Sequence, residues 1–250
     1  MREQIHTIPI GEALAAAEEC PFCWLHRQAE QRAIGYFAGS CASYMEPSVR
    51  AITNRTGFCR EHTKKLYDYG NPLGSALMIQ THYETVMLQL QEQLEQYEIP
   101  EKRTLFRKKK PEQKQPIWQQ MQQQADACAI CDQVEESVAR QYNVFFSLLK
   151  EPEFRQRLEQ CNGFCMLHFA RLLQTAESDL PQSQAAWFYP TVYRVMQENL
   201  ARVKADLDLL IRKYDYRNAN LPWDNARDAL PRAMQKMAGI QPADAPYRKD

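Results

Sequence analysis

The chain has 250 residues, 25% of them charged, and its 31 lysines and arginines balance its 31 aspartates and glutamates. Such a composition is typical of an ordinary folded protein, made of one large domain or two small ones. It excludes a globally basic nucleic-acid binder and an acidic disordered chain.

The start of the chain carries no signal for export. Residues 1–11 lack a basic stretch followed by an apolar one, and no apolar run approaches the roughly 20 residues that span a bilayer. We therefore expect a cytoplasmic protein that spans no membrane. Because thiols stay reduced in the cytoplasm, the eight cysteines are expected to be ligands rather than disulfides.

The elements of the first half all indicate helices. Glycine is scarce, helix formers are common and no alternating β-branched runs occur, so the fold class is predicted to be all-α. A helix over residues 24–45 follows the Cys20-Pro-Phe-Cys23 motif, and Pro47 opens a short second helix. Gly57 then suits a helix end, and Cys59-Arg-Glu-His62 opens the next helix with its Cys and His on one face.

A longer helix closes the first half, and a basic segment follows it. The apolar residues of this helix step by four and three, at Tyr83, Met87, Leu90, Leu94 and Tyr97. We expect this stripe to be core, with a helix–helix dimer seam as the alternative. Residues 98–124 form a basic and Gln-rich linker by composition. Its basic stretch, Lys102–Lys114, is expected to be a solvated charge run, or alternatively an arm for nucleic acid.

The second half repeats the order of motifs in the first. Cys128-Ala-Ile-Cys131 precedes a predicted helix over residues 132–150, and Pro152 opens a short helix. Gly163-Phe then leads into Cys165-Met-Leu-His168. The last helix again carries an apolar stripe that we expect to be core, at Tyr193, Met196, Leu200, Val203, Leu207, Leu210 and Tyr214.

The repeated order predicts an internally duplicated helical bundle with two similar halves. The predicted parts are a first repeat over 1–97, the linker over 98–124, a second repeat over 125–215 and a C-terminal helix and tail over 216–250. In this last part Asp224 is expected to cap a short helix that reaches Met237 and stops at Gly239.

Each repeat supplies three thiols and one imidazole, the ligand set of a closed tetrahedral zinc site. We predict that each half is held together by its own site, formed by Cys20, Cys23, Cys59 and His62 in one half and by Cys128, Cys131, Cys165 and His168 in the other. Two Zn²⁺ ions per chain are expected. The alternatives are an iron–sulfur cluster, which usually takes four cysteines, and a redox-active thiol pair. Cys41 and Cys161 fall outside the pattern, and we expect both to be buried apolar residues, with a spare ligand or a redox-sensitive thiol as the alternative for Cys161.

The duplicated CxxC…GFCxxH arrangement resembles an uncharacterised bacterial family known as a domain of unknown function. The similarity covers nearly the whole chain and includes Glu153-Phe154-Arg155 and the ending Tyr214-Asp215-Tyr216-Arg217…Pro222-Trp223. The resemblance implies a helical, metal-binding bacterial protein and implies no activity.

No catalytic signature appears in the sequence. It contains no Ser/His/Asp order, paired-carboxylate motif, P-loop or dinucleotide fingerprint, so we assign no catalytic residue and lean against an enzyme. The function that we expect is a zinc-binding helical interaction or regulatory protein. The alternatives are a redox- or metal-responsive sensor, an iron–sulfur electron-transfer protein and a nucleic-acid binder that uses the linker.

Overall fold

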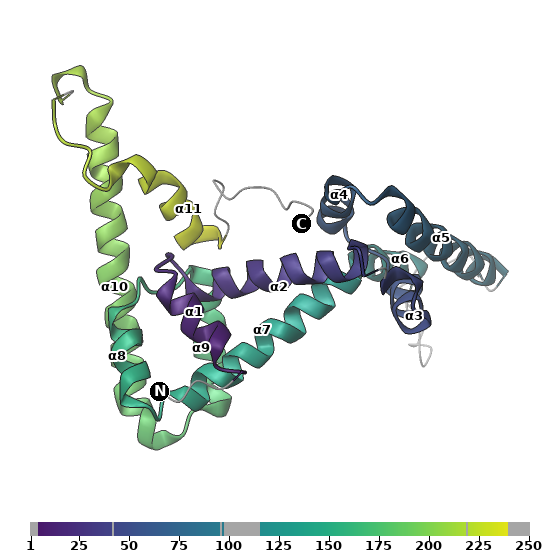
Figure 1. Ribbon diagram of the computed structural model, residues 1–250, viewed down its shortest axis with the longest axis horizontal. Coiled ribbons are helices and arrows are strands. Elements are labelled where there is room, and N and C mark those ends of the chain that lie inside the picture. The colour runs from purple at the N-terminus through teal and green to yellow at the C-terminus, as the bar shows by residue number, and fades with distance from the viewer. Residues whose placement is uncertain (1–4, 42, 96, 98–115, 219, 240–250) are drawn as a thin grey trace, which may run out of the picture. The chain divides into compact units, whose positions relative to one another are not determined.

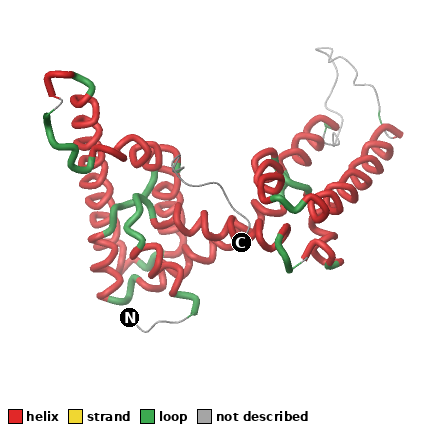
Figure 2. Tube along the Cα trace, turned by 45° about the horizontal axis from the view of Figure 1, so that its top comes forward, coloured by secondary structure: helices red, strands yellow, loops and turns green. Residues whose placement is uncertain are grey.

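The computed structural model describes residues 5–41, 43–95, 97, 116–218 and 220–239. Throughout this part of the chain the only regular structure is helical, as Figure 2 shows. The all-α prediction is therefore confirmed. The α-helices of the described residues are α1 (Ile8–Ala15), α2 (Pro21–Ala38), α3 (Pro47–Thr56), α4 (Arg60–Tyr69), α5 (Pro72–Glu95), α6 (Ile117–Asp126), α7 (Ala129–Leu148), α8 (Pro152–Gln160), α9 (Met166–Asp179), α10 (Gln182–Lys213) and α11 (Ala229–Ala238). Short 3₁₀ helices lie at Ser43–Met45, Tyr216–Asn218 and Ala226–Asp228.

Prolines set several of the helix starts. Pro47 and Pro152 begin α3 and α8 as predicted, because a missing N–H costs nothing in the first turn. The same rule moves the start of α2 to Pro21, between the two cysteines of its motif, rather than to residue 24. This helix ends at Ala38, and residues 43–45 form a separate 3₁₀ helix, so the prediction of one helix to residue 45 is wrong. Likewise α7 covers residues 129–148 rather than 132–150.

The chain divides into two compact units, and each combines segments from both sequence repeats. Of the described residues, unit 1 contains those in the ranges 5–29 and 135–239, and unit 2 contains those between 30 and 134. Both divisions fall inside helices, one in α2 and the other in α7.

Unit 1 is built around a buried aromatic cluster. Phe22, Phe145, Phe154 and Phe164 are at most 1% exposed, and the Phe22 ring stacks on Tyr142 with ring centroids 4.0 Å apart. Burial of each such side chain stabilises the fold by roughly 1.5–3 kcal/mol. The longest helix, α10, packs against α8 and α11 (Figure 1). Phe22 belongs to the CxxC motif of α2, so this core also fixes the start of that helix.

In unit 2 the main packing partners are α3 and α5. Arg50 of α3 donates to the Thr81 hydroxyl of α5 at 2.9 Å. The His82 ring contacts the Asn54 carbonyl oxygen at 2.8 Å through Nδ1. These contacts lie in the middle of α5, and Met78 beside them is fully buried.

The apolar stripe of α5 lies outside this core, so the prediction that it is buried is wrong. Its members are 46–75% exposed, at Tyr83, Met87, Leu90, Leu94 and Tyr97. The reason is the face that α5 turns toward α3, because Thr81 and His82 contact α3 whereas their neighbour Tyr83 is 66% exposed. The stripe of α10 is core only in part, since Met196 and Val203 are buried but Tyr193 and Tyr214 are exposed.

The last described helix ends as predicted and begins differently. Gly239, at φ 74°, stops α11, but the residue before its first turn is Asp228 and not Asp224. Asp224 instead has a positive φ of 41° in the turn that precedes the 3₁₀ helix at 226–228. The basic stretch Lys102–Lys114 lies outside the described residues. No helix among the described residues has the length and apolar character needed to cross a bilayer.

Candidate metal centres

Each CxxC motif is placed at the first turn of a long helix. Cys20 directly precedes α2, its carbonyl oxygen accepts from Cys23 N at 3.1 Å, and Cys23 itself lies in the first turn. Cys128 directly precedes α7, and its carbonyl oxygen accepts from Asp132 N at 3.0 Å. Free N–H groups and the helix dipole favour thiolates at this position.

Each CxxH motif opens the following shorter helix in the same way. Cys59 caps α4 and Cys165 caps α9, and the Cys165 sulfur accepts from His168 N at 3.4 Å. A glycine two residues earlier turns the chain into each helix, at φ 59° for Gly57 and φ 80° for Gly163. The predicted glycine turns and helix starts are therefore confirmed, and Cys and His lie three residues apart on one face.

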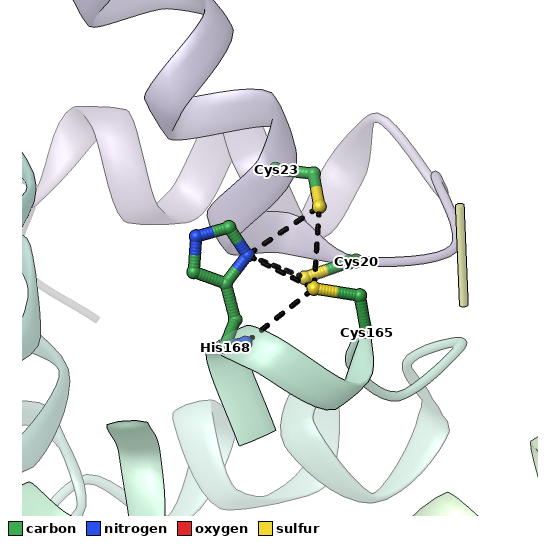
Figure 3. Close-up of side chains that lie close together, drawn as sticks. All are labelled: Cys20, Cys23, Cys165 and His168. Atoms are coloured by element: carbon green, nitrogen blue, oxygen red, sulfur yellow. Dashed lines mark hydrogen bonds between the residues drawn. The ribbon is translucent and has the colours of Figure 1, made fainter. Parts of the chain in front are cut away.

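The structure brings all eight predicted ligands into two groups, which we call the first and the second centre. The first centre consists of Cys20, Cys23, Cys165 and His168 and lies in unit 1. Its His168 Nδ1 lies 3.5, 3.4 and 3.2 Å from the sulfurs of Cys20, Cys23 and Cys165 (Figure 3). The Cys23 and Cys165 sulfurs are 3.6 Å apart. Figure 3 also shows the imidazole and the three sulfurs pointing toward one another.

The second centre consists of Cys59, His62, Cys128 and Cys131 and lies in unit 2. Its His62 Nδ1 lies 3.3 Å from the sulfurs of Cys59 and Cys128 and 3.2 Å from that of Cys131. The Cys59 and Cys131 sulfurs are 3.8 Å apart. A backbone hydrogen bond of 3.0 Å from Ala129 N to the Gly57 carbonyl oxygen joins the two motifs beside the centre.

The pairing of the motifs corrects the sequence prediction. Each centre takes CxxC from one repeat and CxxH from the other, so the expectation that each repeat holds its own site is wrong. Helix length gives the reason. After its CxxC, the chain enters a helix of 18 residues in the first repeat and of 20 in the second, and these carry it about 27 and 30 Å from the first turn. The CxxH that follows then meets the CxxC of the other repeat.

The ligand atoms fit a tetrahedral ion. In each centre the four atoms lie within 4.8 Å of one another. Zinc–sulfur bonds of about 2.3 Å in a tetrahedron place sulfurs about 3.8 Å apart, with the imidazole nitrogen slightly closer. The sulfur pairs at 3.6 and 3.8 Å and the sulfur–nitrogen pairs at 3.2–3.5 Å match these edges. Both groups could therefore hold a metal ion with Nδ1 of the histidine as the nitrogen ligand.

The protonation of the thiols in the first centre also favours a cation there. Burial raises the pKa of the Cys20 thiol to about 12. Hydrogen bonding to Cys165 raises the pKa of Cys23, whereas hydrogen bonds from Cys20 and Cys23 lower the pKa of Cys165 far below its usual range. One thiolate is thus stable by itself, and a second or third would lie beside an existing negative charge. A bound dication removes that repulsion.

The second centre has a different charge arrangement. Burial disfavours the Cys128 thiolate, but the hydrogen bond with His62 outweighs it and lowers the pKa to about 6. Burial likewise disfavours the His62 imidazolium, but its bonds to Cys128 and Glu30 raise the pKa to about 10. Desolvation within the cluster and the Cys128 thiolate raise the pKa of Cys131.

A buried carboxylate supports the second centre, and sequence reasoning missed it. Glu30 is 5% exposed, and its Oε1 lies 2.8 Å from His62 Nε2 and 2.6 Å from Lys65 Nζ. Burial opposes its charge, but the bonds to His62 and Lys65 hold the pKa of Glu30 below its usual range. A carboxylate on the second nitrogen of a metal-binding histidine fixes the ring and its tautomer. Glu30 precedes His62 by 32 residues, and nothing in the local sequence distinguishes it from the other glutamates.

Other residues missed by sequence reasoning cover the first centre from α11. The Cys23 thiol lies 3.4 Å from the Gly239 carbonyl oxygen. Lys236 is 1% exposed, donates to the Glu19 carbonyl oxygen at 2.5 Å and lies 3.1 Å from the Glu19 carboxylate. Because Glu19 is next to the ligand Cys20, this buried ion pair attaches the C-terminal helix to the wall of the centre. Of the two cysteines outside the centres, Cys161 is partly buried, whereas Cys41 is exposed, contrary to the prediction.

Comparison with known proteins gives a family and no activity. The chain matches over residues 1–244 the sequence family described as "Family of unknown function (DUF6062)". No curated protein and no solved structure shows significant similarity to it. The expected resemblance to a family of unknown function is confirmed. With nearly its whole length matched, the chain belongs to this family, DUF6062.

Proposed function

We propose that the chain is a zinc-stabilised helical interaction protein in which both centres are structural. The observation that carries this proposal is the convergence of three thiols and one imidazole at each centre, within 4.8 Å. Four protein ligands fill a tetrahedron and leave no position for a catalytic water. A closed set of this kind supports folding rather than turnover, and structural zinc contributes on the order of 10 kcal/mol to it.

Zinc is the ion that these donors fit best. Thiolate-rich sets with imidazole select Zn²⁺ over hard cations such as Mg²⁺ and Ca²⁺, which take oxygen ligands. An iron–sulfur cluster most often takes four cysteines, whereas each centre offers three. Purified protein that holds zinc will be colourless, and a visible absorption band in protein purified without oxygen would support the iron–sulfur alternative instead.

The exposed apolar stripe of α5 supports the interaction role. Four large side chains of α5 at a helical period of 3.5 residues, and Tyr97 just beyond its end, are 46–75% exposed. An exposed apolar face of this kind marks a surface that contacts other proteins. In this proposal the centres hold the helix starts in place, and α5 presents the binding surface.

The test is to count zinc in paired cysteine variants of the full chain. Wild-type protein purified without added metal should hold two equivalents by elemental analysis. The double variant Cys59→Ser/Cys131→Ser removes two ligands of the second centre and should retain one equivalent. The double variant Cys23→Ser/Cys59→Ser removes one ligand from each centre and should retain substantially less.

These two variants delete the same number of thiols, so each is the control for the other. If each repeat held its own site, the second variant would retain one equivalent and the first would retain less. Wild-type protein without zinc would contradict the proposal altogether. The variant Cys41→Ser, outside both centres, should keep both equivalents.

A further inference from the structure

The two centres differ sharply in access to solvent. In the first centre Cys20 and Cys165 are fully buried and Cys23 is 5% exposed, so all three sulfurs are buried and only His168 is half-buried. The Phe22 ring lies beside His168, with ring centroids 6.0 Å apart, and the Gly239 carbonyl oxygen lies 3.4 Å from the Cys23 sulfur. In the second centre only Cys128 and His62 are buried, whereas Cys59 is half-buried and Cys131 is exposed. An oxidant in solution can therefore reach a ligand of the second centre without prior unfolding.

The exposed thiol has a partner in position to form a disulfide. The Cys131 and Cys59 sulfurs lie 3.8 Å apart at the exposed side of the second centre. Cys128, the third sulfur, lies inside, where it accepts from Cys131 N at 3.5 Å. Thiolate character and exposure together determine which cysteine of a protein is oxidised first, and a neighbouring thiol then resolves the product. Exposure and a neighbouring thiol are both present at the Cys131–Cys59 pair. A cysteine that binds zinc is held as the thiolate, which supplies the reactive form.

We propose that Cys131 is a site of oxidation by hydrogen peroxide and that Cys59 resolves it, so that the second centre is a redox-sensitive metal site. The Cys131 thiolate attacks one peroxide oxygen, the O–O bond breaks and hydroxide leaves, which gives a sulfenic acid. The Cys59 thiolate then attacks the Cys131 sulfur, the S–O bond breaks and a second hydroxide leaves. Two thiolates lose two electrons to form one disulfide, and one peroxide is reduced to two hydroxides.

Oxidation removes two of the four ligands of the second centre. Cys128 and His62 remain, and two donors do not hold zinc at the affinity of four. The centre joins the start of α4 to the start of α7, across 66 residues between His62 and Cys128. Loss of the second centre therefore removes the metal that joins the starts of α4 and α7, while the first centre, whose sulfurs are buried, keeps its metal. This inference rests on the proposed zinc binding and adds a regulatory chemistry to one of the two sites.

The experiment follows zinc release in the full-length variant Cys41→Ser/Cys161→Ser, which lacks both thiols outside the centres. Zinc content is measured first and reports on the proposed function by itself. Hydrogen peroxide is then added with a chromogenic zinc chelator. One equivalent should be released about tenfold or more faster than the other, because a buried thiolate reacts only in molecules that have opened locally. Peptide mapping at the end of the fast phase should find the Cys59–Cys131 disulfide.

A matched pair of variants assigns the fast phase. Added Cys165→Ser disables the first centre and should leave the fast phase in place, whereas added Cys128→Ser disables the second and should abolish it. If either variant fails to fold, the mapped disulfide decides the assignment in the parent protein. Two equivalents released at equal rates, or a first disulfide among Cys20, Cys23 and Cys165, would overturn the inference while leaving zinc binding established. Protein without zinc before peroxide is added would instead overturn the proposed function.

Discussion

At the scale of single residues, the second centre is distinguished by the Glu30 carboxylate that contacts the His62 ring. Glu30 Oε1 lies 2.8 Å from His62 Nε2, on the side of the ring opposite the three sulfurs. This contact fixes which nitrogen keeps its proton and leaves Nδ1 free to bind a metal. In the first centre the shortest contacts of His168 Nδ1 are likewise with sulfurs, so Nδ1 is the expected ligand atom in both.

Replacement of Glu30 tests this support directly. We expect Glu30→Gln to lower zinc affinity at the second centre by about 10–100-fold, the usual effect of losing the partner of a metal-binding histidine. The control is Glu61→Gln, because Glu61 also contacts Lys65, at 2.7 Å, but is largely exposed, whereas the carboxylate that contacts the imidazole is that of Glu30. Competition with a chromogenic chelator measures both variants, and equal affinities would remove Glu30 from the centre's function.

The pKa values of the second centre predict how its zinc affinity depends on pH. Without metal at neutral pH, His62 with a pKa of about 10 is protonated, and Cys131, whose pKa is raised, is a thiol. Zinc binding must displace one proton from each, which makes at least two protons per ion. Affinity should therefore fall by at least about 100-fold for each pH unit lowered near pH 7–9. Below about pH 6 it should fall more steeply, because Cys128, with a pKa of about 6, also becomes protonated.

Zinc titrations of the Cys165→Ser variant, which isolates the second centre, measure this slope. Calorimetry in buffers of different ionisation enthalpy counts the released protons independently. A zinc affinity that stays constant from pH 7 to 9 would contradict the charge arrangement described above.

At the scale of helices, the sequence was sufficient to predict a helix start or a turn wherever a single proline or glycine determines the backbone conformation. Pro47 and Pro152 begin helices because of their fixed φ, and Gly57 and Gly163 turn the chain because they adopt positive φ. The face that a helix buries could not be predicted in the same way. The stripe of α5 has a core-like period, yet α3 packs against another face of the helix, the one that carries Thr81 and His82.

The turn into α4 can be tested by one substitution. Gly57 has φ 59° and ψ −148°, a region open almost only to glycine, and a Cβ there would overlap the His82 ring. Gly57→Ala should lower the free energy of unfolding by about 1–3 kcal/mol or more and weaken zinc binding at the second centre. The control is Gly35→Ala in α2, where a Cβ meets nothing within 4 Å, and stability should rise by about 0.5–1 kcal/mol. Chemical denaturation with zinc present measures both, and a neutral Gly57→Ala would contradict the described backbone.

At the scale of the whole chain, the ligands were predictable and their partners were not. CxxC and CxxH spacings are local, so all eight residues of the two groups could be identified as candidate ligands from the sequence alone. The pairing depends on where α2 and α7 carry the chain after each CxxC, and this follows from helix length and packing. Unit 1 and unit 2 therefore each contain parts of both sequence repeats. A prediction based on sequence proximity pairs neighbouring motifs and misses the pairing of CxxC from one repeat with CxxH from the other.

The pairing of motifs between repeats has a consequence for local stability that amide hydrogen exchange can measure. Loss of one ligand should loosen the helix start that shares its centre, however distant in sequence. Cys128→Ser should lower amide protection in α4, whose ligand His62 lies 66 residues earlier, and leave α9 unchanged. Cys20→Ser should do the reverse, because its partner His168 lies 148 residues away at the start of α9. A metal site contributes on the order of 10 kcal/mol, so protection should fall by tenfold or more, about 1.4 kcal/mol.

Each of these variants is the internal control for the other, because both replace the first cysteine of a CxxC motif at a helix start. Pairing within a repeat requires the opposite result, with Cys128→Ser loosening α9 and Cys20→Ser loosening α4. Equal loosening of both helices in both variants would instead mean that the two units unfold together. The result expected here is two separate responses, because no ligand is shared between the centres and each lies within one compact unit.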